Sequence, residues 1–137
     1  MPAEIALEFL RRHPPFFYLA PEEMRLLLRG AGEVFYRRGE TVPEVGEQLV
    51  IVRQGALAER AGADGRLLEL RDEGSVLGLS AEEEAASIRR IAHEDSILLR
   101  FPRATVDALK AANARFADYF ERRDRHRKRF LLSLIHI

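Results

Sequence analysis

Two stretches of this sequence are dense in charged side chains, and charged groups are candidates for binding or catalysis. Glu82, Glu83 and Glu84 form an acidic run, and residues 115–129 hold seven basic and three acidic side chains. Such runs are most often solvated helix faces, and the alternative is a contact surface for a charged partner. Lys plus Arg and Asp plus Glu each number 22, so the formal net charge is +0. The balanced charge gives no overall field that would hold a nucleic acid, so we expect none as a partner.

The residue types used by enzymes and metal sites are either missing or wrongly spaced. The chain has no cysteine, which excludes disulfides, thiolate metal ligands and a cysteine nucleophile. No phosphate-loop or dinucleotide glycine pattern is present. The histidines, which show no metal-ligand spacing, are His13, His93, His126 and His136. The serines that lack a nucleophile-elbow context are Ser75, Ser80, Ser87 and Ser96. The sequence therefore predicts no catalytic residue, no metal and no enzyme.

Size and composition are those of one cytoplasmic domain. The chain has 137 residues, of which 47% are hydrophobic and 32% are charged, so one hydrophobic core is expected. Residues 1–8 contain two glutamates and no basic residue, unlike a signal peptide. The apolar runs are far shorter than the roughly 20 residues that span a bilayer, and no membrane partner is expected.

Two helices are expected before the first strand. Ile5 and Phe9 lie one turn apart on an apolar stripe, and the helix that carries them ends before Pro14. A second helix begins at Pro21, because proline fits the first helical position, and Gly30 ends it.

Residues 33–101 have the texture of an antiparallel sheet. Short apolar runs alternate with glycine-containing turns, and Ala63-Asp64-Gly65 is typical of a hairpin. The expected strands lie near residues 34–36, 49–52, 56–60, 66–70, 75–77, 88–93 and 96–101. Seven or eight short strands at this spacing predict a closed or rolled sheet.

One short helix should interrupt the sheet, and two helices should follow it. Ser80 and Glu83 have capping-box spacing, with Ser80 as N-cap and Glu83 reaching back. After the strands, a helix begins at Pro102, and a long helix covers residues 114–130. Phe116 and Phe120 should pack that helix on the sheet. Beyond Phe120 the residues leave no apolar stripe, which is typical of a solvent-crossing connector or of a helix that awaits a partner.

Five stretches resemble, in order, the cyclic-nucleotide-binding domain of bacterial proteins; they are residues 9–16 with Leu19 and Pro21-Glu22, then 36–40, 52–56, 94–100 and 114–120. The resemblance covers nearly all of residues 5–131. It implies a mainly β fold with flanking helices: an antiparallel, jelly-roll-like eight-stranded β-roll with two N-terminal helices, one short inserted helix and two C-terminal helices. The implied β-roll domain spans residues 1–120.

The resemblance also locates a ligand pocket and shows that this chain departs from the family's pattern there. In nucleotide-binding members, the inserted helix offers its amides to the cyclic phosphate, a glutamate holds the ribose, and an arginine pairs with the phosphate. In this sequence, Leu79 occupies the position of that glutamate and Ala86 the position of that arginine. Arg89 or Arg90 could replace that arginine in another register, since adjacent strand residues face opposite ways; otherwise both are exposed strand residues. The residues of this degenerate pocket are Gly78, Leu79, Ser80, Ala86, Ser87, Arg89 and Arg90. Glutamates 82–84 would repel a phosphate, so cyclic AMP and cyclic GMP are disfavoured as ligands and no cofactor is expected.

The amino-acid sequence of these stretches is most similar to that of a bacterial group in which the domain precedes a CBS-domain pair and nucleotidyltransferase-like domains. That resemblance implies a sensory or regulatory module whose partners are downstream domains of its own chain, with residues 121–131 as a charged connector helix. A second copy of the chain is a further candidate partner. The alternative is the sensor half of a transcription regulator, although the charged positions after Phe120 lack the apolar heptads of a dimerisation helix.

The last six residues differ in character from what precedes them. Residues 132–137 are largely apolar and follow the most charged stretch of the chain. They resemble a translated sequencing-adapter end, and segments of that kind are set aside in fold reasoning. An apolar terminal strand is the alternative interpretation. On the first interpretation the gene continues beyond Leu131.

Overall fold

The computed structural model of the chain describes residues 3–43, 46–62, 64–80, 83 and 87–135. Helices lie before and after the strands, as predicted. The N-terminal group is α1 (Ala3–Arg11), the short 3-10 helix η1 (Phe16–Tyr18) and α2 (Pro21–Arg29). The C-terminal group is α4 (Arg103–Ala112) and α5 (Ala114–Ile135). The predicted inserted helix lies largely outside the described residues.

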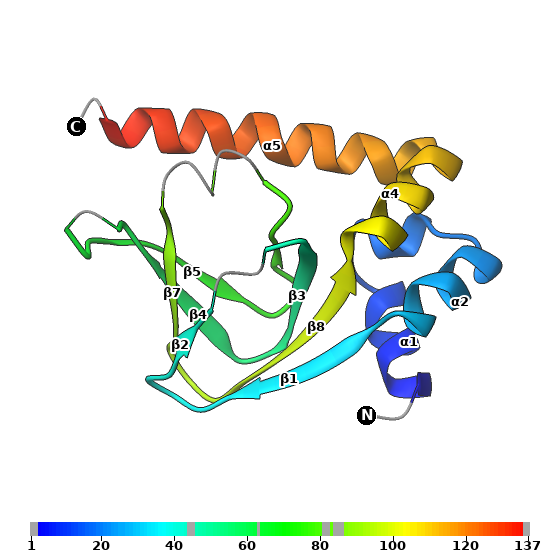
Figure 1. Ribbon diagram of the computed structural model, residues 1–137, viewed down its shortest axis with the longest axis horizontal. Coiled ribbons are helices and arrows are strands. Elements are labelled where there is room, and N and C mark those ends of the chain that lie inside the picture. Colours follow the sequence, from blue (N-terminus) through cyan, green and yellow to red (C-terminus); the bar gives the residue numbers. More distant parts are fainter. Residues whose placement is uncertain (1–2, 44–45, 63, 81–82, 84–86, 136–137) are drawn as a thin grey trace.

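Eight antiparallel strands form two four-stranded sheets, which confirms the predicted roll. The strands are β1 (Gly32–Tyr36), β2 (Thr41–Val42), β3 (Gln48–Gln54), β4 (Ala56–Arg60), β5 (Leu67–Asp72), β6 (Val76–Leu77), β7 (Arg89–Ala92) and β8 (Ser96–Pro102). One sheet has the order β1-β8-β3-β6 and the other β2-β7-β4-β5. The helices α1, α2 and α4 gather at one end of the roll, and α5 runs along one side of it (Figure 1).

The central strand β3 divides the core into two parts. Residues 49–52 are fully buried, because both faces of this strand are covered. Leu49 and Ile51 pack with the helices, whereas Val50 and Val52 face the interior of the roll. Successive side chains on a strand point to opposite faces, so one apolar run supplies both clusters.

Aromatic side chains fix the start of α5 on the roll. Phe116 and Phe120 are buried with ring centroids 5.1 Å apart, and the ring of Phe16 lies 6.3 Å from Phe116 and 5.5 Å from Phe101. This confirms the predicted role of the Phe116 and Phe120 pair. Asn113 also joins the helices, since its Oδ1 accepts the Phe116 amide at 3.0 Å. Within the described residues, no helix is both long and apolar enough to cross a bilayer.

Two glycines in turns have nearly the same positive φ, but only one of them has close neighbours. Comparing them distinguishes the cost of backbone strain from the cost of a steric clash. Gly39 has φ +90 with nothing within 4 Å of an added Cβ, whereas Gly55 has φ +92 and its Cβ would lie 2.4 Å from the Ser96 Oγ. We expect Gly39→Ala to lower the free energy of unfolding by about 1–2 kcal/mol from backbone strain, and Gly55→Ala to lower it clearly more. Urea unfolding measures both. Equal losses would show that the turn relieves the clash by shifting.

Candidate functional site

The residues predicted to line the pocket begin directly after β6. Gly78 has φ 90 and Leu79 has φ 51, so Leu79 holds a left-handed conformation that costs a non-glycine residue about 1–2 kcal/mol. The carbonyl of Leu79 accepts a hydrogen bond from the Arg123 Nη2 at 3.3 Å. The Ser80 hydroxyl accepts the Glu83 amide at 3.3 Å, which confirms Ser80 as the predicted cap.

Glu83 does not behave as predicted. Its carboxylate does not reach back to the cap, nor does it face solvent where it would meet a phosphate. The residue is 6% exposed, and its Oε2 accepts a hydrogen bond from Arg90 at 2.5 Å. Its Oε1 lies 3.4 Å from the Nε of Arg127 on α5. Two buried arginines attract this carboxylate more strongly than one backbone amide can.

The other predicted positions do not converge on one place. Arg89 and Ser87 are exposed, and Ser87 has φ 53, whereas Ala86 lies outside the described residues. Arg90 is buried at 8% exposed, so the alternative in which both strand arginines are exposed is wrong. It lies opposite Glu59 across the β4–β7 pair, and its Nε donates to the Glu59 Oε2 at 2.9 Å. Arg90 is therefore paired with carboxylates of its own chain.

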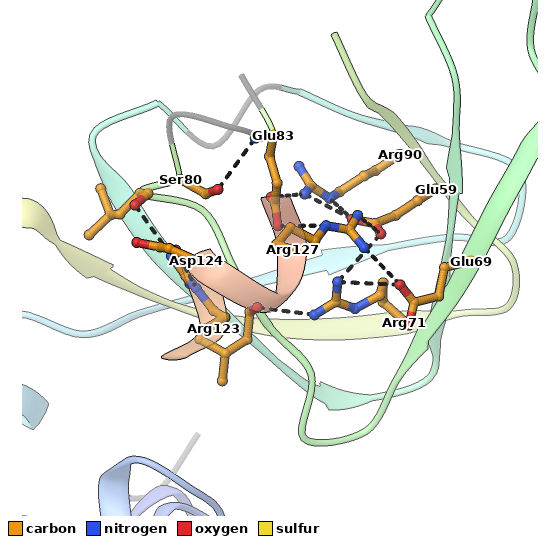
Figure 2. Close-up of polar contacts among 11 residues, drawn as sticks. Glu59, Glu69, Arg71, Ser80, Glu83, Arg90, Arg123, Asp124 and Arg127 are labelled. Atoms are coloured by element: carbon orange, nitrogen blue, oxygen red, sulfur yellow. Dashed lines mark hydrogen bonds and ion pairs between the residues drawn. The ribbon is translucent and has the colours of Figure 1, made fainter. Parts of the chain in front are cut away.

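Arg127 inserts from α5 into the same cluster (Figure 2). Its Nη2 donates to Glu59 at 2.6 Å and its Nη1 donates to Glu69 at 2.8 Å. The Nε lies at ion-pair distance from Glu83 but lacks the geometry of a hydrogen bond. Arg127 is 5% exposed. The interpretation of this basic stretch as a solvated helix face therefore holds for most of its charged side chains, which are exposed, but not for Arg127. Helix α5 continues without a break from Ala114 through the charged region.

The cluster is balanced in charge. Three carboxylates, those of Glu59, Glu69 and Glu83, face three guanidinium groups, those of Arg71, Arg90 and Arg127. Glu59 lies at the centre and is 0% exposed. A buried carboxylate is tolerable only when it is paired and hydrogen bonded. Its Oε1 receives Arg127 and Arg71, and its Oε2 receives Arg90.

Burial also affects two titratable groups beside the cluster. Desolvation raises the pKa of the Tyr119 hydroxyl, and nearby Arg123 opposes this shift. Desolvation lowers the pKa of Lys110, which Asp107 opposes, and the ammonium lies 4.5 Å from the centroid of the Phe120 ring. Both shifts have the same first cause, the partial burial of these side chains where α4 and α5 meet.

Sequence reasoning missed Glu59, Glu69, Arg71 and Arg127. One signal was present: Leu57 and Glu59 share a strand face because they are two residues apart, and Leu57 is an obvious core residue. That spacing predicts a carboxylate directed inward and in need of a partner. No local pattern identifies Arg127, which lies 68 residues further along the chain.

Chemically, the arrangement is a set of ion pairs in which each carboxylate is held by arginines. Among the described residues, no group of His, Cys, Asp and Glu could hold a metal ion. The arginine that could have received a phosphate, Arg90, is neutralised by two glutamates.

The architecture is the β-roll of cyclic-nucleotide-binding domains. Solved structures with this fold include cAMP-bound PfPKA-R (141-441), with a TM-score of 0.75, 16% identity, and coverage of 96% of this chain and 46% of that one. The sensor domain of the transcriptional regulator DNR from Pseudomonas aeruginosa matches with a TM-score of 0.71, 20% identity, and coverage of 88% of this chain and 91% of that one. The Thermus thermophilus catabolite activator protein matches with a TM-score of 0.64, 27% identity, and coverage of 88% of this chain and 62% of that one.

This chain thus spans about half the length of the PfPKA-R fragment. A scan against protein-family models finds no match, and a search of curated protein sequences also finds none. The likeness is therefore one of fold.

Removing Arg127 should destabilise the protein strongly. Arg127→Ala leaves Glu59 with fewer partners in a buried place, so we expect a loss of about 3–5 kcal/mol in the free energy of unfolding. The matched control is Arg125→Ala, an exposed arginine on the same helix, which should change stability by no more than about 0.5 kcal/mol. Urea unfolding of both variants measures the difference. Equal effects would mean that the cluster does not hold α5.

Proposed function

We propose that this chain is a regulatory domain of a bacterial signal-transduction protein in which the cyclic-nucleotide position is degenerate. One observation carries the proposal: the segment after β6 and the strands β4, β5 and β7 direct their charged side chains at each other and at α5. Arg90 and Arg127 are each paired with both Glu59 and Glu83. No basic group of this cluster is left to attract a phosphate.

The output of such a domain would pass through α5. Arg123 holds the carbonyl of Leu79 and Arg127 holds Glu83, so this helix is tied to the pocket segment at two points. A change in the pocket would therefore be transmitted to the C-terminal part of the chain. The helix has charged residues where a dimerisation helix has apolar heptads, which favours coupling to other domains of the same protein.

The resemblance of the sequence to bacterial proteins with a CBS pair and nucleotidyltransferase-like domains supports downstream domains of that kind. In this proposal, residues 121–131 connect the domain to them, residues 132–137 derive from an adapter, and the protein acts in the cytoplasm. The second candidate is the sensor half of a transcription regulator. It is favoured by the likeness to the DNR sensor domain, which this chain covers to 91%.

Binding of cyclic nucleotides should be absent at micromolar concentrations. The pocket side chains of this chain offer a cyclic phosphate no unpaired positive charge, because Arg90 and Arg127 are paired with the buried carboxylates of Glu59 and Glu83. Isothermal calorimetry with cyclic AMP and cyclic GMP on the full chain tests this, with Arg127→Ala in parallel to open the cluster. A micromolar Kd for the wild-type chain would contradict the proposed degeneracy.

The reading frame beyond Leu131 distinguishes the two candidates. We expect a long sequencing read of the gene to continue in frame into CBS and nucleotidyltransferase-like domains. A helix-turn-helix in that position would favour the transcription regulator instead. A stop codon directly after a genomically encoded Ile137 would contradict both assignments and identify a standalone domain.

A further inference from the structure

We infer that the cluster beneath α5 is a binding site for a guanidinium cation, occupied in cis by Arg127, and that a guanidinium-bearing ligand can take the place of that side chain. The inference deepens the proposed regulatory function and rests on it, since it gives the altered pocket a ligand class. The site is built from Glu59, Glu69 and Glu83, with Arg127 as its internal ligand (Figure 2).

Each nitrogen of the Arg127 guanidinium faces a different carboxylate. Nη2 lies 2.6 Å from Glu59 on β4, Nη1 lies 2.8 Å from Glu69 on β5, and Nε lies 3.4 Å from Glu83 after β6. These carboxylates come from three separate segments, so the roll, rather than a local turn, sets their spacing. A planar guanidinium presents its donors in a fixed fork that can meet all three at once, whereas an ammonium is a compact point charge.

The remaining arginines leave this position short of one positive charge. Arg90 bridges Glu59 and Glu83, and Arg71 lies near Glu59 and Glu69. Without Arg127, three carboxylates face these two guanidinium groups, which leaves one net negative charge in a buried place. The vacated position would therefore attract a cation and would repel the anionic ligand of the family.

The internal ligand is attached in a way that permits exchange. Arg127 is the one buried residue of the stretch 121–133, while Arg122, Arg125 and Lys128 beside it are exposed. Beyond Phe120, the hydrogen bonds that the described part of α5 makes to the roll come from Arg123 and Arg127. Release of the Arg127 side chain would thus break two of these three hydrogen bonds. A ligand must compete with the high local concentration of a tethered group.

Chemical rescue of Arg127→Ala tests the inference without any nucleotide. Ethylguanidinium chloride should raise the melting temperature of this variant by about 4 °C at ten times its Kd. It should leave the wild-type chain and Arg125→Ala without such a gain, because their site is filled. Ethylammonium chloride at the same concentration controls for charge and salt. Equal rescue by both cations, or no rescue of a folded Arg127→Ala, would overturn the inference.

A second measurement on the wild-type chain covers the case in which Arg127→Ala fails to fold. Amide hydrogen exchange in residues 121–135 should accelerate with ethylguanidinium, which competes with Arg127, and not with ethylammonium; unchanged exchange would overturn the inference.

Acetyl-arginine amide in the same assays separates the sources of the cation. If acetyl-arginine amide also raises the melting temperature or accelerates the exchange, the ligand is an arginine side chain of a protein. If only ethylguanidinium does so, the ligand is a free small molecule. Binding of cyclic AMP would refute the degenerate pocket but would leave these results unchanged.

Discussion

The Glu59 carboxylate constrains the whole site, because it is ionisable, completely enclosed and surrounded by arginines. Its two oxygens receive Arg71, Arg90 and Arg127 from β5, β7 and α5. A carboxylate removed from water is costly unless each oxygen is hydrogen bonded. The strands and the last helix must therefore stay in register with one another around this residue. The charged part of α5 is thus tied to a group inside the roll, whereas Phe116 and Phe120 fix the start of the helix.

The interior of the roll therefore has an apolar part and an ionic part. On β4, Leu57 belongs to the apolar cluster with Val50 and Val52, and Glu59, on the same face two residues later, begins the ionic cluster. The apolar part stabilises the roll by excluding water. The ionic part adds little net stability, since desolvation offsets most of its attraction. It joins one point on α5, Arg127, to three carboxylates of the roll.

This division explains how one fold can hold different ligand chemistry. The alternation of apolar residues on β3 and β8 and the aromatic contacts of Phe16, Phe101 and Phe116 define the architecture, and the likeness to cyclic-nucleotide-binding structures at 16–27% identity reflects that layer. Polar side chains can change without altering such a fold. Here Glu59 on β4, Glu69 on β5 and Glu83 after β6 are the partners of an arginine from α5.

The sequence alone determined the roll, its flanking helices and the anchoring of α5 by Phe116 and Phe120, because strand and helix periodicities are local and apolar side chains have only one favourable environment. It also indicated that Leu79 and Ala86 stand where charged ligand contacts are expected. The tertiary structure decided the rest. Whether Arg90 faces inward depends on its register opposite Glu59, and whether Arg127 is solvated depends on where a helix 68 residues beyond Glu59 comes to lie. A charged side chain is stable in water or in a paired buried site, and no local pattern distinguishes the two before the partners are brought together.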